Sequence, residues 1–259
     1  MALAKASVKS SFANVDDYFF MQQNFYEKAS ALIVRDDHYI HNHNPQASNL
    51  GFGALLTEPH KFVGSSALDF GCGGGRNMLN LASFKLFSRI DGVDISEINI
   101  RAAHSKFKLY YPNIKSNTYQ NSLEALGVPS HILYRFVFST ITLQHISSWQ
   151  LRQKIFTSIF RSMESGGVFS FQMGYNSVNL ARGWKFPANK YRVRYKKNLF
   201  GAPSTNGKYD VSVSHPSQLL KDLTKVGFEQ IEWVISPSFA NQTHCAWIWI
   251  KARKPELSA

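Results

Sequence analysis

Ser66-Ala-Leu-Asp-Phe-Gly-Cys-Gly-Gly-Gly75 is the stretch of this 259-residue sequence that decides its fold. Its first half is a short apolar run that predicts a buried strand, and residues 77–84 have the apolar spacing of a helix. The glycines between them let the backbone turn sharply and approach a ligand closely. A helix N-terminus favours negative charge, so this turn predicts a site for a ligand that carries an anionic group such as a carboxylate.

Strands and helices alternate outward from this turn. Further strands are predicted over residues 89–95, 115–119, 134–139 and 168–173, and helices after Ser96, after Ser147 or Ser148, and over 216–226. Alternation of this kind predicts an α/β fold, a doubly wound and mostly parallel sheet with helices on both faces. Two closing strands over 228–235 and 244–251 lie near enough to pair, which predicts an antiparallel C-terminal edge.

The chain divides into a core and two additions. The core is predicted over residues 61–173 and 214–253. Residues 1–60 are predicted to form an N-terminal helical and lid segment, with a helix over 15–34. Residues 174–213 form an insertion after the fifth strand that is too long for an ordinary loop, and long insertions in compact domains are often functional.

Composition restricts the class of protein. The net charge of +12 favours anionic partners without choosing among nucleic acid, a membrane surface and a small molecule. Two cysteines, Cys72 and Cys245, cannot build a disulfide framework or a zinc cluster, which fits a reducing compartment. The first 14 residues hold no apolar signal region, and no apolar run is long enough to span a bilayer. A cytoplasmic location without a membrane span is therefore expected.

Two features separate the glycine turn from a dinucleotide-binding turn. The nicotinamide fingerprint requires a small residue at the position that Arg76 occupies. Asp69 precedes the first glycine, and its carboxylate would repel a pyrophosphate but attract an ammonium group.

At this point the sequence resembles the class I S-adenosylmethionine (SAM)-dependent methyltransferases. The first motif of that family is an acidic residue followed by Gly-x-Gly-x-Gly, which matches Asp69, Gly71, Gly73 and Gly75. Its second motif is an acidic residue that closes the second strand, which matches Asp94. The resemblance covers residues 60–173 well and 215–252 by topology. It implies a Rossmann-like sheet of seven strands, SAM as cofactor and S-adenosylhomocysteine (SAH) as product.

The resemblance also implies a set of cofactor-binding residues. Asp94 would bind the ribose hydroxyls, because a carboxylate accepts two hydrogen bonds from a diol. The family's third site, beside the adenine, is usually acidic, and Asn121 and Ser122 stand in its place here. The full implied set is Asp69, Gly71, Cys72, Gly73, Gly75, Asp94, Ile95, Asn121, Ser122, Ser139 and Thr140.

The exit of the fourth strand is the candidate acceptor side. Residues 136–146 resemble the small-molecule branch of the family and lack the Asp/Asn-Pro-Pro-aromatic motif of many nucleic-acid amino-methylating members. His145 lies just past this strand, and its unperturbed pKa suits a catalytic base at neutral pH. The alternative is a histidine that packs or caps locally. Gln144 beside it is a candidate for contacting the substrate.

The two additions hold further candidates for the substrate side. The insertion is rich in Lys and Arg with interleaved aromatic residues, which suits a wall for an anionic acceptor. A solvated basic loop or a single-stranded nucleic-acid surface has the same composition. The N-terminal segment carries His38, His41 and His43, but no acidic cluster accompanies them, so a lid is expected rather than a metal site. The named candidates are Tyr39, Tyr175, Trp184, Arg192 and Arg194.

The sequence therefore predicts a SAM-dependent methyltransferase. Its acceptor is predicted to be small and anionic, of the sugar, nucleotide-sugar or natural-product type, and methylated at an O or N atom. Two alternatives stay open: an RNA methyltransferase, and a non-catalytic SAM-binding sensor or partner subunit. The identity of the acceptor and the oligomeric state are not encoded in any of these patterns.

Overall fold

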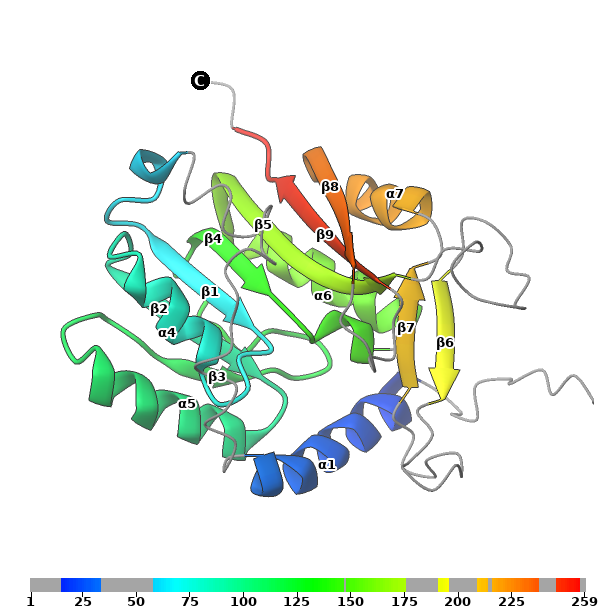
Figure 1. The fold of residues 1–259 in the computed structure, drawn as a ribbon, viewed down its shortest axis with the longest axis horizontal. Helices are drawn as coiled ribbons and strands as arrows, with labels where there is room; N and C mark the ends of the chain where they lie inside the picture. Colours follow the sequence, from blue (N-terminus) through cyan, green and yellow to red (C-terminus); the bar gives the residue numbers. More distant parts are fainter. Residues whose placement is uncertain are drawn as a thin grey trace, which may run out of the picture.

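The computed structural model describes residues 15–33, 58–146, 148–175, 191–195, 209–213, 216–237 and 246–256 (Figure 1). The strands of the central sheet are β1 (Ser66–Phe70), β2 (Arg89–Asp94), β3 (Thr118–Gln120), β4 (Tyr134–Ser139), β5 (Met163–Tyr175), β8 (Glu229–Pro237) and β9 (Ala246–Arg253). The helices are α1 (Val15–Ile33), α4 (Arg76–Ser83), α5 (Glu97–Tyr110), α6 (Trp149–Arg161) and α7 (Pro216–Val226), with short 3₁₀ turns η2 (Pro59–Lys61) and η3 (Leu143–His145).

The sheet has the predicted doubly wound arrangement. Strands β3, β2, β1, β4 and β5 lie side by side in that order and run parallel. The two closing strands pair with each other in antiparallel fashion, as expected from the sequence. β9 lies between β5 and β8 and is antiparallel to both, so β8 is the edge strand. The α/β fold with an antiparallel C-terminal edge is confirmed.

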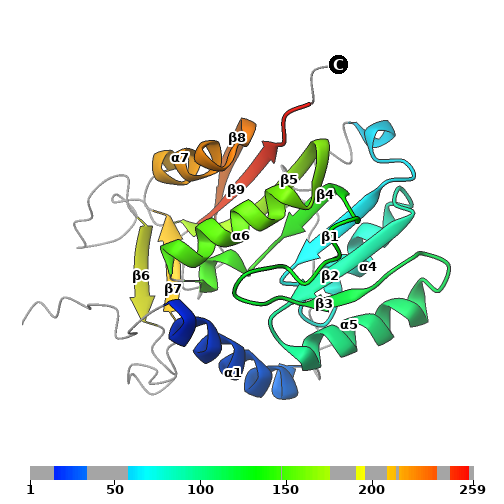
Figure 2. The same cartoon turned by 180° about the vertical axis from the view of Figure 1, so that it is seen from behind.

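Helices cover both faces of the sheet (Figure 2). Side chains of α4 and α5 pack in one core cluster, and those of α6 and α7 pack in another. Neighbouring residues of β4 contribute to opposite clusters, Phe136 and Phe138 to the first and Val137 to the second. This alternation follows from the period of two along a strand, and burial on both faces explains why residues 136–138 are all apolar.

The helices begin at residues that satisfy their free backbone N–H groups. The Ser96 hydroxyl accepts a 3.2 Å hydrogen bond from the backbone N–H of Asn99 at the start of α5. Ser148 caps α6 in the same way through the N–H of Leu151. Of the two serines proposed for that cap, Ser148 is therefore the one that serves. α7 begins at Pro216 and ends before Gly227, whose φ is +115°.

The connection from β3 to β4 contains no helix, although residues 121–133 are all described.

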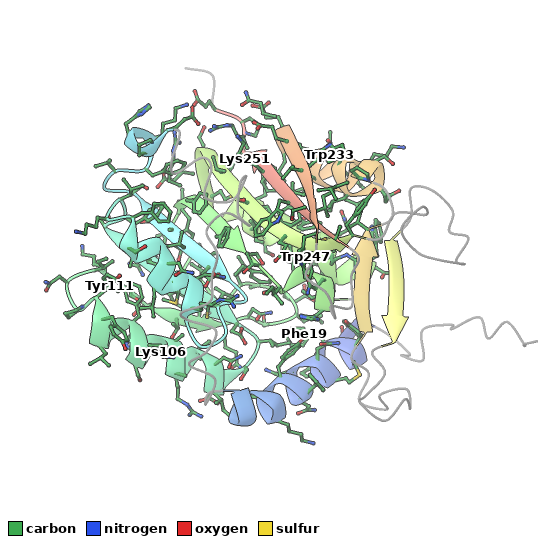
Figure 3. The ribbon with its side chains drawn as sticks, viewed as in Figure 1. Phe19, Lys106, Tyr111, Trp233, Trp247 and Lys251 are labelled. Atoms are coloured by element: carbon green, nitrogen blue, oxygen red, sulfur yellow. The ribbon has the colours of Figure 1, made fainter. Side chains whose placement is uncertain are left out.

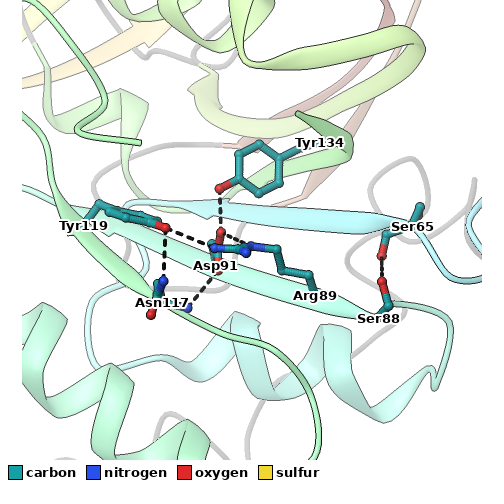
Figure 4. A network of polar contacts seen from close by, with 7 residues as sticks. All are labelled: Ser65, Ser88, Arg89, Asp91, Asn117, Tyr119 and Tyr134. Atoms are coloured by element: carbon teal, nitrogen blue, oxygen red, sulfur yellow. Dashed lines mark hydrogen bonds and ion pairs between the residues drawn. The ribbon is translucent and has the colours of Figure 1, made fainter. Parts of the chain in front are cut away.

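A buried polar network joins the strands beside this connection (Figure 4). Asp91 of β2 accepts hydrogen bonds from the Tyr134 hydroxyl and Arg89 Nε, both at 2.6 Å, and from the backbone N–H of Asn117 at 2.8 Å. Asp91 is fully buried, and these donors satisfy a carboxylate that would otherwise be costly to bury.

Two further strands lie within the predicted insertion, β6 (Tyr191–Tyr195) and β7 (Tyr209–Val213). They pair with each other in antiparallel fashion, and β7 also pairs in parallel with Gly174 and Tyr175 at the end of β5. β9 occupies one edge of β5 up to Tyr175, whereas β4 occupies the other edge only up to Phe171. The hairpin therefore extends the β4 side of β5, beyond the carboxyl end of β4 (Figure 1).

Within the described ranges, no helix combines the length and the apolar character that crossing a bilayer requires.

Candidate functional site

The glycine turn after β1 is bonded to the end of β2. The backbone N–H groups of Gly71 and Cys72 both donate to the carbonyl oxygen of Val93, at 2.7 and 3.0 Å. Gly71 has a φ of +76°, and a Cβ atom there would lie 2.1 Å from Oγ1 of Thr142. Glycine is therefore required at this position for both its backbone conformation and its close contact.

One side of the turn is packed and the other side is open. Gly75, with a φ of +90°, precedes α4, and a Cβ atom there would lie 3.1 Å from Cα of Ala103 in α5. A Cβ atom at Gly73 or Gly74 would meet no atom of the described residues within 4 Å. The middle of the turn thus exposes backbone on its open side, where a ligand can approach it closely.

Asp94, the last residue of β2, is held by three hydrogen bonds. Its Oδ2 accepts from the backbone N–H of Gly73 at 2.9 Å, and its Oδ1 accepts from the backbone N–H of Ser96 and the side chain of Asn99, both at 3.0 Å. Burial raises the pKa of Asp94, and these donors oppose that rise. Because each carboxylate oxygen can accept two hydrogen bonds, Oδ2 retains an acceptor position for a ligand.

Asp69, before the first glycine, is fully buried, and both of its carboxylate oxygens lack a hydrogen-bond partner in the described part of the chain. Burial raises the pKa of Asp69 to about 7, and the charge of Asp94 also raises it, whereas the charge of Arg76 and the nearby donors of the Asn77 side chain and the Met78 backbone lower it. An unpaired buried carboxylate is costly. The ammonium group of an amino-acid moiety is the kind of partner that would satisfy it.

The exit of β4 contacts the same turn. Asn77 of α4 donates a 2.8 Å hydrogen bond to Oγ1 of Thr140, while the Asn77 carbonyl oxygen and the Ser139 hydroxyl are buried without a partner among the described residues. Thr142 donates to the carbonyl oxygens of Thr140 and Gly71. Ile141 between them has a φ of +55°, a strained value for a β-branched residue and one that is concentrated at functional sites.

The candidate acceptor residues meet at η3. His145 is half-buried, and its carbonyl oxygen accepts a 3.0 Å hydrogen bond from the hydroxyl of Tyr18 in α1. The ring of Tyr26 in α1 lies 6.2 Å from the His145 ring. Gln144 is buried, and its Oε1 has no partner among the described residues. Tyr175, at the end of β5, is also buried, and both β5 and β7 contact η3.

Two residues predicted to lie beside the adenine occupy different environments. The backbone N–H of Asn121 donates to the carbonyl oxygen of Asp94 at 3.1 Å, so buried Asn121 lies next to the end of β2. Ser122 is exposed, and its hydroxyl accepts from the backbone N–H of Ala125 within its own turn. Ile95 is half-buried between Asp94 and Ser96, and its carbonyl oxygen accepts from the Gln120 side chain. Of the pair, Asn121 is better placed to contact a ligand at Asp94.

Cys72 lies in the turn with a buried side chain, and burial raises the pKa of its thiol. A Cβ atom on Gly92 would lie 2.9 Å from its Sγ. Its side chain thus packs behind the turn, and only its backbone is available on the ligand side.

Several predicted substrate residues lie outside what the structure describes. Tyr39 and Trp184 fall outside the described residues, as do His38, His41 and His43. Arg192 and Arg194 lie on β6 opposite Ser212 and Asp210, and their backbone alone is described. Among the described residues, no three His, Cys, Asp or Glu side chains are grouped so as to hold a metal ion.

Sequence reasoning missed four residues that shape the site. Asn77 and Thr142 bond the glycine turn to the exit of β4, whereas Tyr18 and Glu27 connect α1 to η3 and to the start of α5. Thr142 lies within the stretch that follows the fourth strand, so its place in the sequence was a usable signal. Nothing in the local pattern marks Glu27.

A polar groove of about 470 Å³ lies on the outer side of α6 and includes Trp149, Gln153, Arg161 and Lys225. It contains none of the candidate residues, so it is separate from the site at the glycine turn.

Comparison with known proteins agrees with this geometry. Residues 67–167 match the methyltransferase domain family. No curated protein sequence matches the chain significantly. The matched range spans β1 to the start of β5 and includes both acidic motifs. Over residues 67–167 the resemblance to SAM-dependent methyltransferases drawn from the sequence is therefore confirmed.

Solved structures share the fold at low sequence identity. The 1,6-didemethyltoxoflavin-N1-methyltransferase of Burkholderia thailandensis, solved with its substrate and SAH, is 12% identical with a TM-score of 0.68, covering 98% of this chain and 99% of that chain. The N-methyltransferase NodS of Bradyrhizobium japonicum, solved with SAH, is 14% identical with a TM-score of 0.59, covering 89% and 98%. The [4+2]-cyclase SpnF is 16% identical with a TM-score of 0.57, covering 82% and 81%.

Proposed function

We propose that this chain transfers a methyl group from SAM to a nitrogen or oxygen atom of a small, anionic acceptor. The observation that carries the proposal is the combination of a glycine turn with an open side and two buried carboxylates, Asp69 and Asp94, beside it. A dinucleotide would bring a pyrophosphate to this turn, and the Asp69 carboxylate before the first glycine would repel it. SAM instead offers an ammonium group, a diol and an adenine.

The residues of the turn fit the parts of SAM. The free acceptor position on Asp94 Oδ2 receives a ribose hydroxyl, and the buried carboxylate of Asp69 pairs with the ammonium group. Gly73 and Gly74 leave room for the ligand against the backbone. Asn121, next to the end of β2, is the residue proposed to contact the adenine.

Methyl transfer requires the protein mainly to position the two reactants and to accept a proton from the acceptor. SAM supplies a methyl group that a positive sulfonium makes electrophilic. Residues at η3 and the end of β5 hold the acceptor in line, and such positioning supplies a large part of the rate in two-substrate reactions. The His145 imidazole accepts the proton of the attacking N–H or O–H group. Gln144 Oε1, buried and without a partner among the described residues, accepts a hydrogen bond from the acceptor.

A small acceptor methylated at nitrogen receives support from two related folds. The 1,6-didemethyltoxoflavin-N1-methyltransferase and NodS are both N-methyltransferases by name. An anionic acceptor is supported by the net charge of +12 and by the hairpin of β6 and β7 beyond the end of β4, which carries Arg192 and Arg194. Arg guanidinium groups pair well with carboxylate and phosphate groups.

RNA is the alternative acceptor, and the same net charge favours it. A non-catalytic role, or another reaction as in SpnF, is the alternative from a different class, since that cyclase shares the fold. An RNA substrate predicts binding that weakens steeply as the salt concentration rises. A non-catalytic protein predicts SAM binding without methyl uptake by any acceptor.

The test is a calorimetric titration with SAM and SAH, followed by methyl-uptake assays with radiolabelled SAM. Acidic sugars, nucleotides, nitrogen heterocycles and RNA form the acceptor panel, each assayed at two salt concentrations. Binding of both cofactor forms and uptake by a small anionic acceptor are expected. Failure of a folded sample to bind SAH would refute the proposal, and uptake by RNA alone would replace the acceptor class.

A further inference from the structure

Helix α1 contributes a carboxylate to the start of α5. Glu27 Oε1 accepts a 2.5 Å hydrogen bond from the backbone N–H of Glu97, and its Oε2 accepts from the N–H of Ile98 at 3.4 Å. The first N–H groups of a helix lack partners within the helix and carry partial positive charge. A side chain from an element that lies 70 residues earlier in the chain satisfies them here.

Ser96 connects this carboxylate to Asp94. The Ser96 hydroxyl donates to Glu27 Oε2 at 3.1 Å, and its backbone N–H donates to Asp94 Oδ1 at 3.0 Å. Asn99 donates from its backbone to the Ser96 hydroxyl and from its side chain to Asp94 Oδ1. Ser96 is fully buried, so it has little freedom to move away from either carboxylate. The orientation of Asp94 is thus linked to Glu27 through one buried serine.

The arrangement has an electrostatic cost. After burial, the nearby charge of Glu27 also contributes to the raised pKa of Asp94, because two carboxylates repel each other. The partial positive charge at the start of α5 lies between them and offsets this repulsion. If Glu27 served only to attach α1 to α5, the repulsion between its carboxylate and that of Asp94 would weaken this attachment.

We infer that Glu27 is a positioning residue for the cofactor, which acts through Ser96 to hold the Asp94 carboxylate toward the glycine turn. The inference rests on the proposed function, because the ribose contact of Asp94 is proposed there. Glu27 does not touch the cofactor in this role. It makes α1 a part of the cofactor site although α1 lies outside residues 67–167, the range that matches the family.

The chain offers a matched control on the same helix. Tyr18 lies nine residues before Glu27, about 13 Å along the helix axis. Its hydroxyl anchors α1 to the carbonyl oxygen of His145 and accepts a hydrogen bond from Gln22. Phe19 beside it is buried against the core on the side of α1 that faces the sheet (Figure 3). Tyr18→Phe therefore weakens the attachment of α1 at a point remote from Asp94.

The experiment is a calorimetric titration of SAH into the full chain and its variants, with melting temperatures as a check on folding. We expect Glu27→Ala to weaken SAH binding about tenfold and Glu27→Gln about threefold, because the amide oxygen still accepts hydrogen bonds but lacks the charge. Tyr18→Phe is expected to change SAH affinity less than about twofold, since contacts at distant sites act independently. Equal losses for Tyr18→Phe and Glu27→Gln would mean that docking of α1 alone matters, and would overturn the inference.

A double-mutant cycle tests the route through Asp94. In an Asp94→Asn background, Glu27→Gln is expected to have almost no further effect on SAH affinity, because the residue on which it acts has lost its charge. Independent, multiplying effects would overturn the inference. If Glu27→Ala fails to fold, Glu27→Gln decides the outcome. Wild-type protein that does not bind SAH would overturn the proposed function as well, whereas wild-type binding that neither Glu27 variant weakens would overturn this inference alone.

Discussion

The backbone N–H of Gly73 donates a 2.9 Å hydrogen bond to Oδ2 of Asp94, so the two acidic-motif segments of the domain are in direct contact. Gly73 lies in the turn after β1, and Asp94 closes β2. The bond sets the distance between the backbone that faces the ligand and the carboxylate proposed to bind its ribose. A ligand at this site therefore meets both segments at once.

Replacement of Asp94 by alanine should weaken SAH binding by about 2–3 kcal/mol, the contribution expected of a hydrogen bond to a charged group. The chain should still fold, because the parallel pairing of β2 does not depend on this side chain. Calorimetry measures the affinity, and circular dichroism checks the fold. The conservative variant Asp94→Asn should lose less SAH affinity than Asp94→Ala. Unchanged affinity in the alanine variant would refute the ribose assignment.

The raised pKa of Asp69 predicts how stability depends on pH. Its folded value of about 7 lies above the unfolded value near 3.9, so the folded state holds the proton more tightly. The stabilisation from this group is fully present below about pH 4 and is lost as the pH rises through about 7. Asp69→Asn should therefore raise the melting temperature more at pH 8 than at pH 5. An equal change at both pH values would contradict the raised pKa.

The same carboxyl group predicts a pH dependence of binding. If the ammonium group of SAH pairs with ionised Asp69, binding should release a proton near pH 6 and tighten between pH 5.5 and 7.5. Calorimetry in buffers of different ionisation enthalpy counts that proton. Asp69→Asn should remove both the proton release and the pH dependence. Proton release that persists in this variant would point to another group.

Two glycines of the turn should respond differently to alanine. Gly71→Ala should lower the free energy of unfolding by at least about 2 kcal/mol, because it combines a positive φ with a clash against Thr142. Gly74→Ala adds a methyl group that meets no atom of the described residues, so stability should change by less than about 0.5 kcal/mol. That methyl group occupies the open side, and SAH affinity should fall. Urea unfolding and calorimetry separate the two effects.

His145→Ala should leave SAH affinity unchanged and lower turnover about a hundredfold, the usual contribution of a general base. The measurement is steady-state methyl transfer to the acceptor that the uptake assays identify. His131 is exposed, and His131→Ala serves as the matched control. Full activity in His145→Ala would assign the His145 side chain a packing role through its ring contact with Tyr26.

Local pattern was sufficient to predict the framework of the domain. The run from Ser66 to Gly75 predicted strand, turn and helix, and the capping serine at 96 was read correctly, because each depends on residues close in sequence. The hairpin of β6 and β7 was missed, although Tyr191-Arg-Val-Arg-Tyr195 alternates as a strand should. The high positive charge of this segment fits a solvated or ligand-binding loop as well as a strand, so composition did not indicate the hairpin.

The contacts between distant segments were not predictable from one sequence. Glu27 meets the start of α5 and Tyr18 meets His145 only because α1 docks on the folded sheet. The sequence of α1 indicates an apolar face, but no rule of periodicity states which helix terminus that face will approach. The site residues that follow β1, β2 and β4 were predictable because parallel strands end at the same edge of the sheet.

The hairpin at the end of β5 has a consequence for how such a protein diversifies. Among the described residues, it pairs with the rest of the sheet at Gly174 and Tyr175, in register with Ser212 and Val213. The hydrogen bonds that hold Asp94 and the glycine turn come from other segments. A hairpin of different length or charge can therefore replace this one without changing the segments that hold Asp94 and the glycine turn. If the hairpin contacts the acceptor as proposed, acceptor preference can then change while the residues proposed to bind the cofactor stay the same.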